Sequence, residues 1–209
     1  MIPEIKPWKT WSCCLAAAII FAASQFAVSA NNGASTVASS PVSPATGETA
    51  NNENLVGELT RDLLIESIVQ IESAGKPGKV GSKGERGLMQ IKRETWQETT
   101  RGAFGSPLPF SRAFEPALNR QVGSAYLAYL QAFIQSHRSE WKSDERALLL
   151  ACYNAGPTAV ERAGFDVARI PASTRDYVDR AAALHDHYLR EYELPAFQQF
   201  AGAQGDRNS

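Results

Sequence analysis

Residues 59–73 read LTRDLLIESIVQIES, and this stretch decides the fold class because its apolar side chains recur at helical spacing. At about 100° per residue, Ile68 lies about 40° and Ile65 about 100° from Leu64, so the three share one face of a helix. The remaining apolar residues of the stretch widen the same arc. The sequence therefore predicts an amphipathic helix over 59–73 that buries one face in a core.

Glu72 lies inside this apolar arc, whereas Glu66 lies on the opposite side of the helix. A carboxylate on an apolar face is unfavourable unless it is paired, neutralised or used in chemistry. Gly75 and Pro77 end the helix just after Glu72, and the negative end of the helix dipole further disfavours an anion there. We therefore expect a raised pKa for Glu72, as a general acid requires. A solvated Glu72 or a pair with Lys76 is the alternative.

The chain beyond this stretch shows helical periodicity up to about Tyr192. Pro116 suits the first turn of a helix over 117–136. Residues 173–176 spell a capping box with Asp in place of Glu, which is typical of a helix start. No segment alternates with period two, so the sequence predicts a mostly α fold. Two of the expected helices cover 92–101 and 117–136. A third begins at Ser143, a short one ends at Gly164, and the last one starts at Ser173.

Composition divides the 209 residues into four parts. Residues 1–30 combine two lysines, an apolar run and a Val-Ser-Ala end, which predicts a secretory signal peptide, with an uncleaved membrane anchor as the alternative. Residues 31–54 are rich in Ser, Thr, Ala, Asn and Gly, which predicts a disordered linker. Residues 55–193 are long and apolar enough for one domain, and residues 194–209 are expected to form a flexible tail.

Charge and cysteine content exclude two classes of protein. A formal net charge of -1 excludes a generally basic nucleic-acid-binding protein. Three cysteines, two of them at positions 13 and 14, exclude a disulfide scaffold. His185 and His187 are two residues apart on a helix and cannot share a metal as residues four apart would, so we interpret them, with His137, as surface residues. We expect no metal and no cofactor.

Four short motifs occur in a fixed order over residues 55–192. A helical stretch with Asn119, Gly123 and Tyr126-Leu127 lies between the second and the third. Together they resemble the catalytic domain of the soluble lytic transglycosylase (SLT) family, which is related to goose-type lysozyme. The four motifs are Glu72-Ser73, Gly87-Leu88-Met89-Gln90-Ile91, Tyr153-Asn154-Ala155-Gly156-Pro157 and Thr174-Arg175-Asp176-Tyr177-Val178.

The resemblance implies a lysozyme-like α-helical domain with a catalytic cleft that cleaves the MurNAc–GlcNAc bond of peptidoglycan. Glu72 matches the catalytic glutamate of the family. Glycosidases ordinarily use two carboxylates, whereas here the C2 acetamido group of the substrate would act as the nucleophile. Glu72 would first protonate the glycosidic oxygen and then remove the proton of the C6 hydroxyl, which closes a 1,6-anhydro ring without water.

The resemblance also implies residues that bind or position the sugar. Met89 is either a residue that lines the sugar cleft or a core residue, and both interpretations stay open. Ser173 stands where many members of the family have Glu, so a role of that Glu does not carry over. The implied substrate-binding residues are Ser82, Met89, Gln90, Tyr153, Asn154 and Tyr177.

Two other functions stay open at this point. A muramidase of the goose type would hydrolyse the same bond with water and leave a reducing end. A non-catalytic wall-binding component of a secretion or conjugation apparatus would bind glycan strands without cutting them. We expect an exported monomer in the periplasm or cell envelope, with peptidoglycan as its partner and no nucleic acid.

The segment that follows Glu72 is strongly basic. Between residues 74 and 93, six basic side chains accompany only one acidic side chain, Glu85. Peptidoglycan stem peptides carry free carboxylates, which a basic rim of the cleft would attract; a merely solvated loop is equally open. The basic residues are Lys76, Lys79, Lys83, Arg86, Lys92 and Arg93.

Overall fold

The computed structural model describes residues 46–192, with side chains from residue 55 onward. The predicted signal peptide (1–30), the first part of the predicted linker (31–45) and the predicted tail (194–209) lie outside these residues. Within the described range, no helix is long and apolar enough to cross a membrane.

The described residues are mostly helical, which confirms the predicted fold class. Strand pairing within 46–192 is limited to two isolated bridges, which join Val80 to Arg86 and Arg86 to Ile91. The α-helices of the described residues are α1 (Thr46–Ser73), α2 (Arg93–Phe104), α3 (Pro116–Ser136), α4 (Glu145–Ala155), α5 (Pro157–Arg162) and α6 (Ala172–Glu191). Short 3₁₀ segments are η2 (Phe110–Phe114), η3 (Arg138–Glu140) and η4 (Val167–Arg169).

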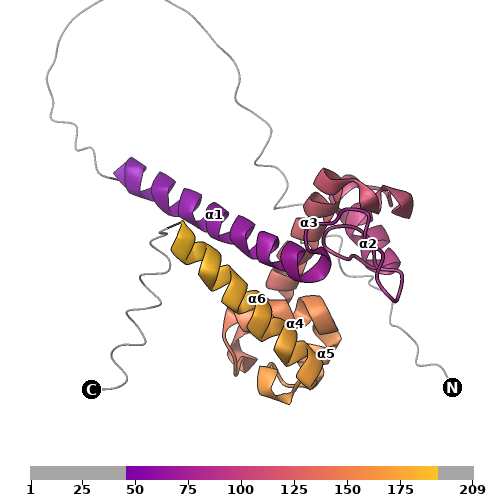
Figure 1. Ribbon diagram of the computed structural model, residues 1–209. Helices are drawn as coiled ribbons and strands as arrows, with labels where there is room; N and C mark the ends of the chain where they lie inside the picture. Colours follow the sequence, from indigo (N-terminus) through magenta and orange to yellow (C-terminus); the bar gives the residue numbers. More distant parts are fainter. Residues whose placement is uncertain (1–45, 193–209) are drawn as a thin grey trace, which may run out of the picture.

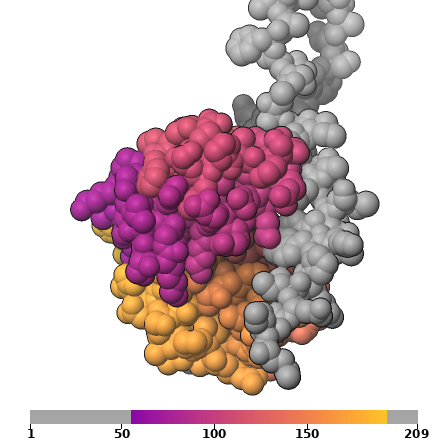
Figure 2. All heavy atoms as spheres, turned by 90° about the vertical axis from the view of Figure 1, so that its right-hand side faces the viewer, coloured from indigo at the N-terminus to yellow at the C-terminus, as the bar shows by residue number. Residues whose placement is uncertain are grey.

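Helices α1 and α6 form an antiparallel pair that extends from the rest of the domain (Figure 1). Helix α6 also packs on α4, α4 packs on α5 and α3, and α3 packs on α2. One face of the molecule shows the α1-to-α3 part of the chain lying against the part that contains α4 to α6 (Figure 2). The C-terminal end of α1 therefore lies at the meeting of the two parts.

The apolar face predicted for α1 is the face that enters the core. Leu64, Ile65, Ile68 and Val69 are all buried, and the last two are fully inaccessible. Each such side chain contributes about 1.5–3 kcal/mol when it leaves water. The core continues through α2, α3 and α4 around fully buried Trp96.

The start of α1 differs from the expectation. The helix begins at Thr46, so residues 46–54 belong to it and not to a disordered linker. No proline lies between Pro44 and Pro77, so every residue of α1 has a backbone donor. Once a helix is nucleated, each added residue costs little because it gains one hydrogen bond. Composition alone missed this extension because the segment carries few apolar residues.

Two helix starts are capped differently from the prediction. Asp144 caps α4 and accepts a hydrogen bond from the Ala147 amide at 2.9 Å, while the Ser143 hydroxyl accepts one from the Val167 amide at 3.0 Å. The predicted capping box at residues 173–176 is wrong. Pro171 is the N-cap residue of α6, and its fixed backbone angle starts the helix two residues earlier.

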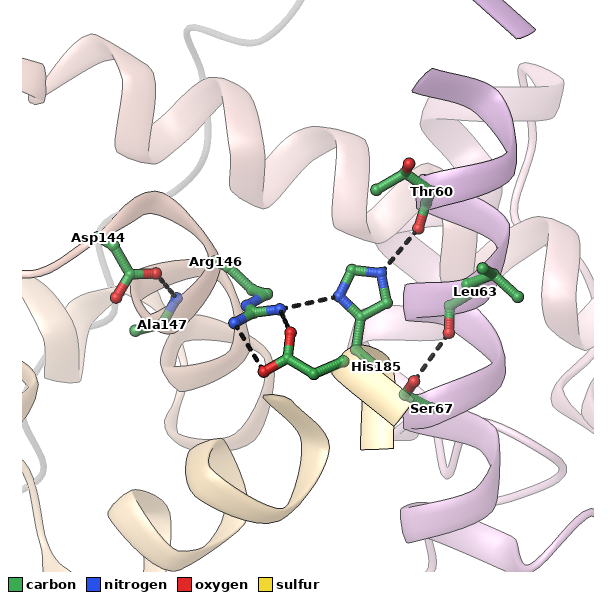
Figure 3. A network of polar contacts seen from close by, with 8 residues as sticks. Thr60, Leu63, Ser67, Asp144, Arg146, Ala147 and His185 are labelled. Carbon is green, nitrogen blue, oxygen red and sulfur yellow. Dashed lines mark hydrogen bonds and ion pairs between the residues drawn. The ribbon is translucent and has the colours of Figure 1, made fainter. Parts of the chain in front are cut away.

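His185 was expected at the surface, but it is buried with 4% of its area exposed. Its Nε2 atom lies 3.0 Å from the Thr60 carbonyl, and Arg146 donates to its Nδ1 atom at 3.2 Å (Figure 3). Arg146 in turn forms an ion pair of 2.5 Å with Asp186. An arginine can only donate, so the ring is neutral and carries its proton on Nε2. The network joins α1, α4 and α6.

The other two histidines divide. His137 is half-buried, and its ring lies 4.8 Å from the ring of Phe133 and 4.9 Å from that of Phe165. His187 is exposed, as expected. The surface interpretation is therefore correct only for His187.

The His185 network predicts a loss of stability in acid. Burial holds the pKa of His185 below its ordinary value of 6.5; the Thr60 hydrogen bond and the Asp186 charge oppose this effect, and the Arg146 charge adds to it. The unfolded chain then binds more protons, so stability rises with pH up to about 6.5 and is lost below it. Urea unfolding between pH 7 and 5 should show a steeper loss for the wild type than for His185→Gln, which cannot be protonated.

His187→Gln is the matched control, because it makes the same change at an exposed position of the same helix. It should follow the wild type at every pH. Identical pH dependence of the wild type and His185→Gln would show that the buried ring does not titrate on unfolding.

Candidate active site

Glu72 lies in the last turn of α1 and is half-buried. Burial raises the pKa of its carboxyl group to about 6, from an ordinary value of 4.5. Tyr177, Lys79 and Arg180 act in the opposite direction, and the charge of Glu85 reinforces the rise. The net effect is the raised pKa that the apolar arc predicted.

Two tyrosines from the other half of the chain lie next to this carboxyl group. Tyr177 of α6 is buried with 4% exposed, and its hydroxyl has no partner with hydrogen-bonding geometry, so its contact with Glu72 is a loose one. Tyr153 of α4 donates its hydroxyl to the Met89 carbonyl at 2.7 Å. Burial, together with the nearby Glu72 charge, raises the pKa of both phenols well above 10. Both are neutral donors at any physiological pH.

A fully buried asparagine on α3 holds the loop that faces Glu72. The Asn119 side chain accepts a hydrogen bond from the Met89 amide at 2.8 Å and donates to the Ala113 and Arg86 carbonyls at 2.8 and 3.1 Å. Gly87 has a φ of 80°, and a Cβ there would come within 2.2 Å of the Ala113 carbonyl. Only glycine fits, so the loop lies directly on α3. Asn119 belongs to a recognised motif, but it was not among the predicted site residues.

Met89 is a core residue, which corrects its predicted contact with the sugar. Its side chain is fully buried against α3. A Cβ at Gly123 would come within 2.1 Å of the Met89 sulfur, so the glycine makes room for it. Met89 acts on the site through its backbone, because its carbonyl accepts the Tyr153 hydroxyl.

Gln90 forms hydrogen bonds within the loop, whereas Ser82 and Asn154 are exposed to solvent. The Gln90 amide donates to the Gly87 carbonyl at 2.8 Å and to the Lys79 carbonyl at 3.2 Å, with a left-handed φ of 46°. Ser82 and Asn154 are both exposed, and neither side chain forms a hydrogen bond within the described part of the chain. The structure thus joins Glu72 with Tyr153 and Tyr177, and leaves the roles of the other predicted residues as proposals.

Two charged residues of the basic segment lie near Glu72, and neither was among the predicted catalytic or sugar-binding residues. The Lys79 ammonium group donates a hydrogen bond to the backbone carbonyl of Glu72. Glu85 is half-buried, and one of its carboxylate oxygens accepts from the Lys83 amide at 3.0 Å. In the sequence both residues belong to a run of charges, and such a run does not say which member lies near Glu72.

A row of aromatic rings continues from Tyr153 along α3. The ring of Tyr126 lies 5.8 Å from that of Tyr153 and stacks on that of Tyr129 at 6.0 Å. Burial raises the pKa of Tyr129 to about 12. Half-buried tyrosines present an apolar ring beside a polar hydroxyl, which suits a ligand with both kinds of surface.

No metal-binding group is formed by the described residues. Within 46–192, no three His, Cys, Asp or Glu side chains are arranged to hold an ion. Cys152 is buried, and burial raises the pKa of its thiol to about 12, so it is an unreactive core residue.

The helical fold, with a half-buried glutamate at the end of its first helix, defines a lysozyme-like domain. The sequence model of the family described as transglycosylase SLT domain matches residues 53–169, which is more than half of the chain. The chain therefore belongs to the transglycosylase SLT domain family. A comparison with curated protein sequences finds no match.

Solved structures agree with this family. The lytic transglycosylase Slt from Pseudomonas aeruginosa, in the form of an inactive mutant, is 24% identical over 71% of this chain and 25% of its own, with a TM-score of 0.54. The 70 kDa soluble lytic transglycosylase from Escherichia coli is 29% identical over 62% of this chain and 22% of its own, with a TM-score of 0.51. The chain spans about a quarter of the length of these proteins.

Replacement of Asn119 tests how the loop is held. Asn119→Ala leaves three backbone groups next to a buried space without their partner, so the free energy of unfolding should fall by about 2–4 kcal/mol. Urea unfolding monitored by circular dichroism measures this change. Asn154→Ala removes the same amide at an exposed position and should stay within about 0.5 kcal/mol of the wild type. Equal stability of the two variants would contradict the structural role of Asn119.

Proposed function

We propose that the protein is a peptidoglycan lytic transglycosylase that cleaves the MurNAc–GlcNAc β-1,4 bond and forms 1,6-anhydroMurNAc ends. The observation that carries this proposal is one half-buried carboxyl group, Glu72, with a pKa of about 6 beside two neutral phenols. Membership of the transglycosylase SLT domain family supports it.

In this proposal Glu72 acts first as an acid and then as a base. The neutral carboxyl group protonates the glycosidic oxygen while the C2 acetamido oxygen of MurNAc attacks C1 and the glycosidic bond breaks. The intermediate is cationic, so it stabilises the Glu72 carboxylate and lowers the pKa of Glu72 as the leaving sugar departs. Glu72 then removes the proton of the C6 hydroxyl, which attacks C1, releases the acetamido group and closes the anhydro ring. The acid form is regenerated without water.

The tyrosines supply neutral hydrogen-bond donors for this sequence. The Tyr177 hydroxyl has no strong partner within the described residues, so its proton is available to Glu72 or to the acetamido group. Tyr153 is engaged by Met89 and fixes the loop against α4. Gln90, Ser82 and Asn154 are proposed sugar contacts that complete the binding site.

A goose-type muramidase is the second candidate, and Glu85 is the observation that favours it. A second carboxylate can act as the base that activates water. One oxygen of Glu85 is already held by the Lys83 amide, however, which favours a role in shaping the loop. Hydrolysis leaves reducing ends and transglycosylation leaves anhydro ends, so the products separate the two.

A non-catalytic wall-binding component of a secretion or conjugation apparatus is less well supported. A pure binding protein would gain stability from an apolar residue at position 72, since burial of an ionisable group is costly. An active enzyme could nevertheless serve such an apparatus. A monomer is sufficient for the proposed reaction, because the proposed acid and both phenols belong to one chain.

Replacement of the proposed acid is the central test. Glu72→Gln keeps the shape but transfers no proton, so release of anhydro-muropeptides from purified sacculi should fall by at least about 10²–10⁴-fold. Stability should hold or rise, because an ionisable group leaves a half-buried position. Mass analysis of the released muropeptides and thermal unfolding measure the two effects. An active and folded Glu72→Gln protein would end the assignment.

Asp62→Asn is the matched control, because it likewise converts an acid to its amide, at an exposed position of α1. It should leave activity and stability near the wild-type values. Glu66 is less suitable, since it forms a 2.6 Å ion pair with Arg120 and accepts a hydrogen bond from Gln70. Wild-type activity should also fall as pH rises through about 6, because the acid form is required first.

Export to the periplasm or cell envelope is part of the proposal, since peptidoglycan lies there. The sequence pattern of residues 1–30 supports cleavage of a signal peptide after Ala30. N-terminal sequencing of the protein from the envelope fraction should begin at Asn31. A mature protein that retains Trp8 would contradict cleavage and favour an anchor.

A further inference from the structure

The C-terminal end of α1 takes its positive charge from outside the helix. The last four carbonyls of a helix lack partners within it, and a nearby cation is favourable there because of the helix dipole. The last turn of α1 contains no basic residue. The Lys79 ammonium group, seven residues beyond Glu72, donates to the Glu72 carbonyl and fills this role.

The backbone of Lys79 is held as firmly as its ammonium group. Its carbonyl accepts hydrogen bonds from the Gly87 amide at 3.0 Å and from the Gln90 side chain at 3.2 Å. The same turn is fixed to α3, because Asn119 holds the Met89 amide. Lys79 is exposed, but hydrogen bonds hold both its ammonium group and its backbone carbonyl, so it is more than a merely solvated charge of the loop.

The charged and titratable groups around Glu72 come from every element that packs on it. The α6 cation, Arg180, is exposed and forms an ion pair of 2.9 Å with Asp176. Lys79 is the cation that contacts Glu72 itself, and its charge opposes the rise in the pKa of the carboxyl group. The full set is Tyr177 and Arg180 from α6, Tyr153 from α4, and Lys79 and Glu85 from the loop.

We propose that Lys79 is a positioning residue for Glu72: its ammonium group fixes the last turn of α1 and keeps a positive charge beside the carboxyl group. The inference rests on the proposed function, in which Glu72 must lose its proton and regain it. A fixed cation stabilises the carboxylate that acts as the base in the second step. It also limits how far burial can raise the pKa, so Lys79 sets the pH range in which Glu72 works.

Three variants at this position separate charge from hydrogen bonding. Lys79→Met removes both, Lys79→Gln keeps a donor without the charge, and Lys79→Arg keeps both. The pKa of Glu72 is measured by NMR titration of ¹³C-labelled carboxyl groups in the full chain without substrate. The same variants are assayed for kcat on purified sacculi across pH 4–8, a range that extends about two units on either side of the Glu72 pKa of about 6.

The neutral variants should shift the Glu72 pKa upward and move the falling limb of the activity profile to higher pH by the same amount. Lys79→Arg should restore both to wild-type values. Lys83→Met is the matched control, because Lys83 is an exposed lysine of the same loop whose side chain forms no hydrogen bond or ion pair with the described residues. It should leave both readouts unchanged.

Two outcomes would overturn the proposal. One is a lower melting temperature for Lys79→Met with an unchanged Glu72 pKa and pH profile, since Lys79 would then only cap the helix. The other is an equal shift in Lys83→Met, which would show a general loop charge. If the wild type releases no anhydro ends, the proposed function fails, yet the NMR titration still decides whether Lys79 acts on Glu72.

Discussion

The burial of one carboxyl group at the end of α1 is the constraint on which the site depends. An isolated helix would leave Glu72 in water with a pKa near 4.5, and it would be a poor acid near neutral pH. The antiparallel packing of α6 on α1 brings Tyr177 over this end, and α4 brings Tyr153. Burial then outweighs the favourable contacts, and the pKa rises to about 6. The acid is thus a product of tertiary packing.

The loop after α1 is shaped by close approach to α3 as well as by its own hydrogen bonds. Gly87 and Gly123 both stand where a Cβ would overlap atoms of a neighbour, so backbone and sulfur pack directly against α3. Asn119 supplies the hydrogen bonds that this contact would otherwise leave unmade. A loop held from α3 and bonded to α4 through Met89 can carry Lys79 to a fixed position. The contact of the Lys79 ammonium group with Glu72 therefore depends on Gly87, Gly123 and Asn119, none of which touches Glu72 in the hydrogen bonds described above.

The sequence predicts well what one helix determines by itself. The apolar arc predicted the buried face of α1, which follows from positions along one helix. It also predicted the direction of the Glu72 pKa, because a carboxyl group within that arc is buried once other helices pack on it. The sequence did not predict the contact of Lys79 with Glu72 or the burial of His185, because the partners of these two residues lie on other segments that the fold brings close. The capping box at Ser173 was overridden by Pro171, whose ring fixes the backbone two residues earlier. Local patterns describe a face of a helix, and not what packs on it.

The α1–α6 pair joins two groups whose protonation has opposite effects on stability. His185 has a lowered pKa in the folded protein, so acid favours the unfolded chain below about 6.5. Glu72 has a raised pKa, so the folded protein holds the extra proton between about 4.5 and 6 and loses that advantage as pH rises. Proton uptake by Glu72 offsets part of the destabilisation that proton uptake by His185 causes. The acid form of Glu72, which the proposed function needs, is therefore also the form that the folded protein favours.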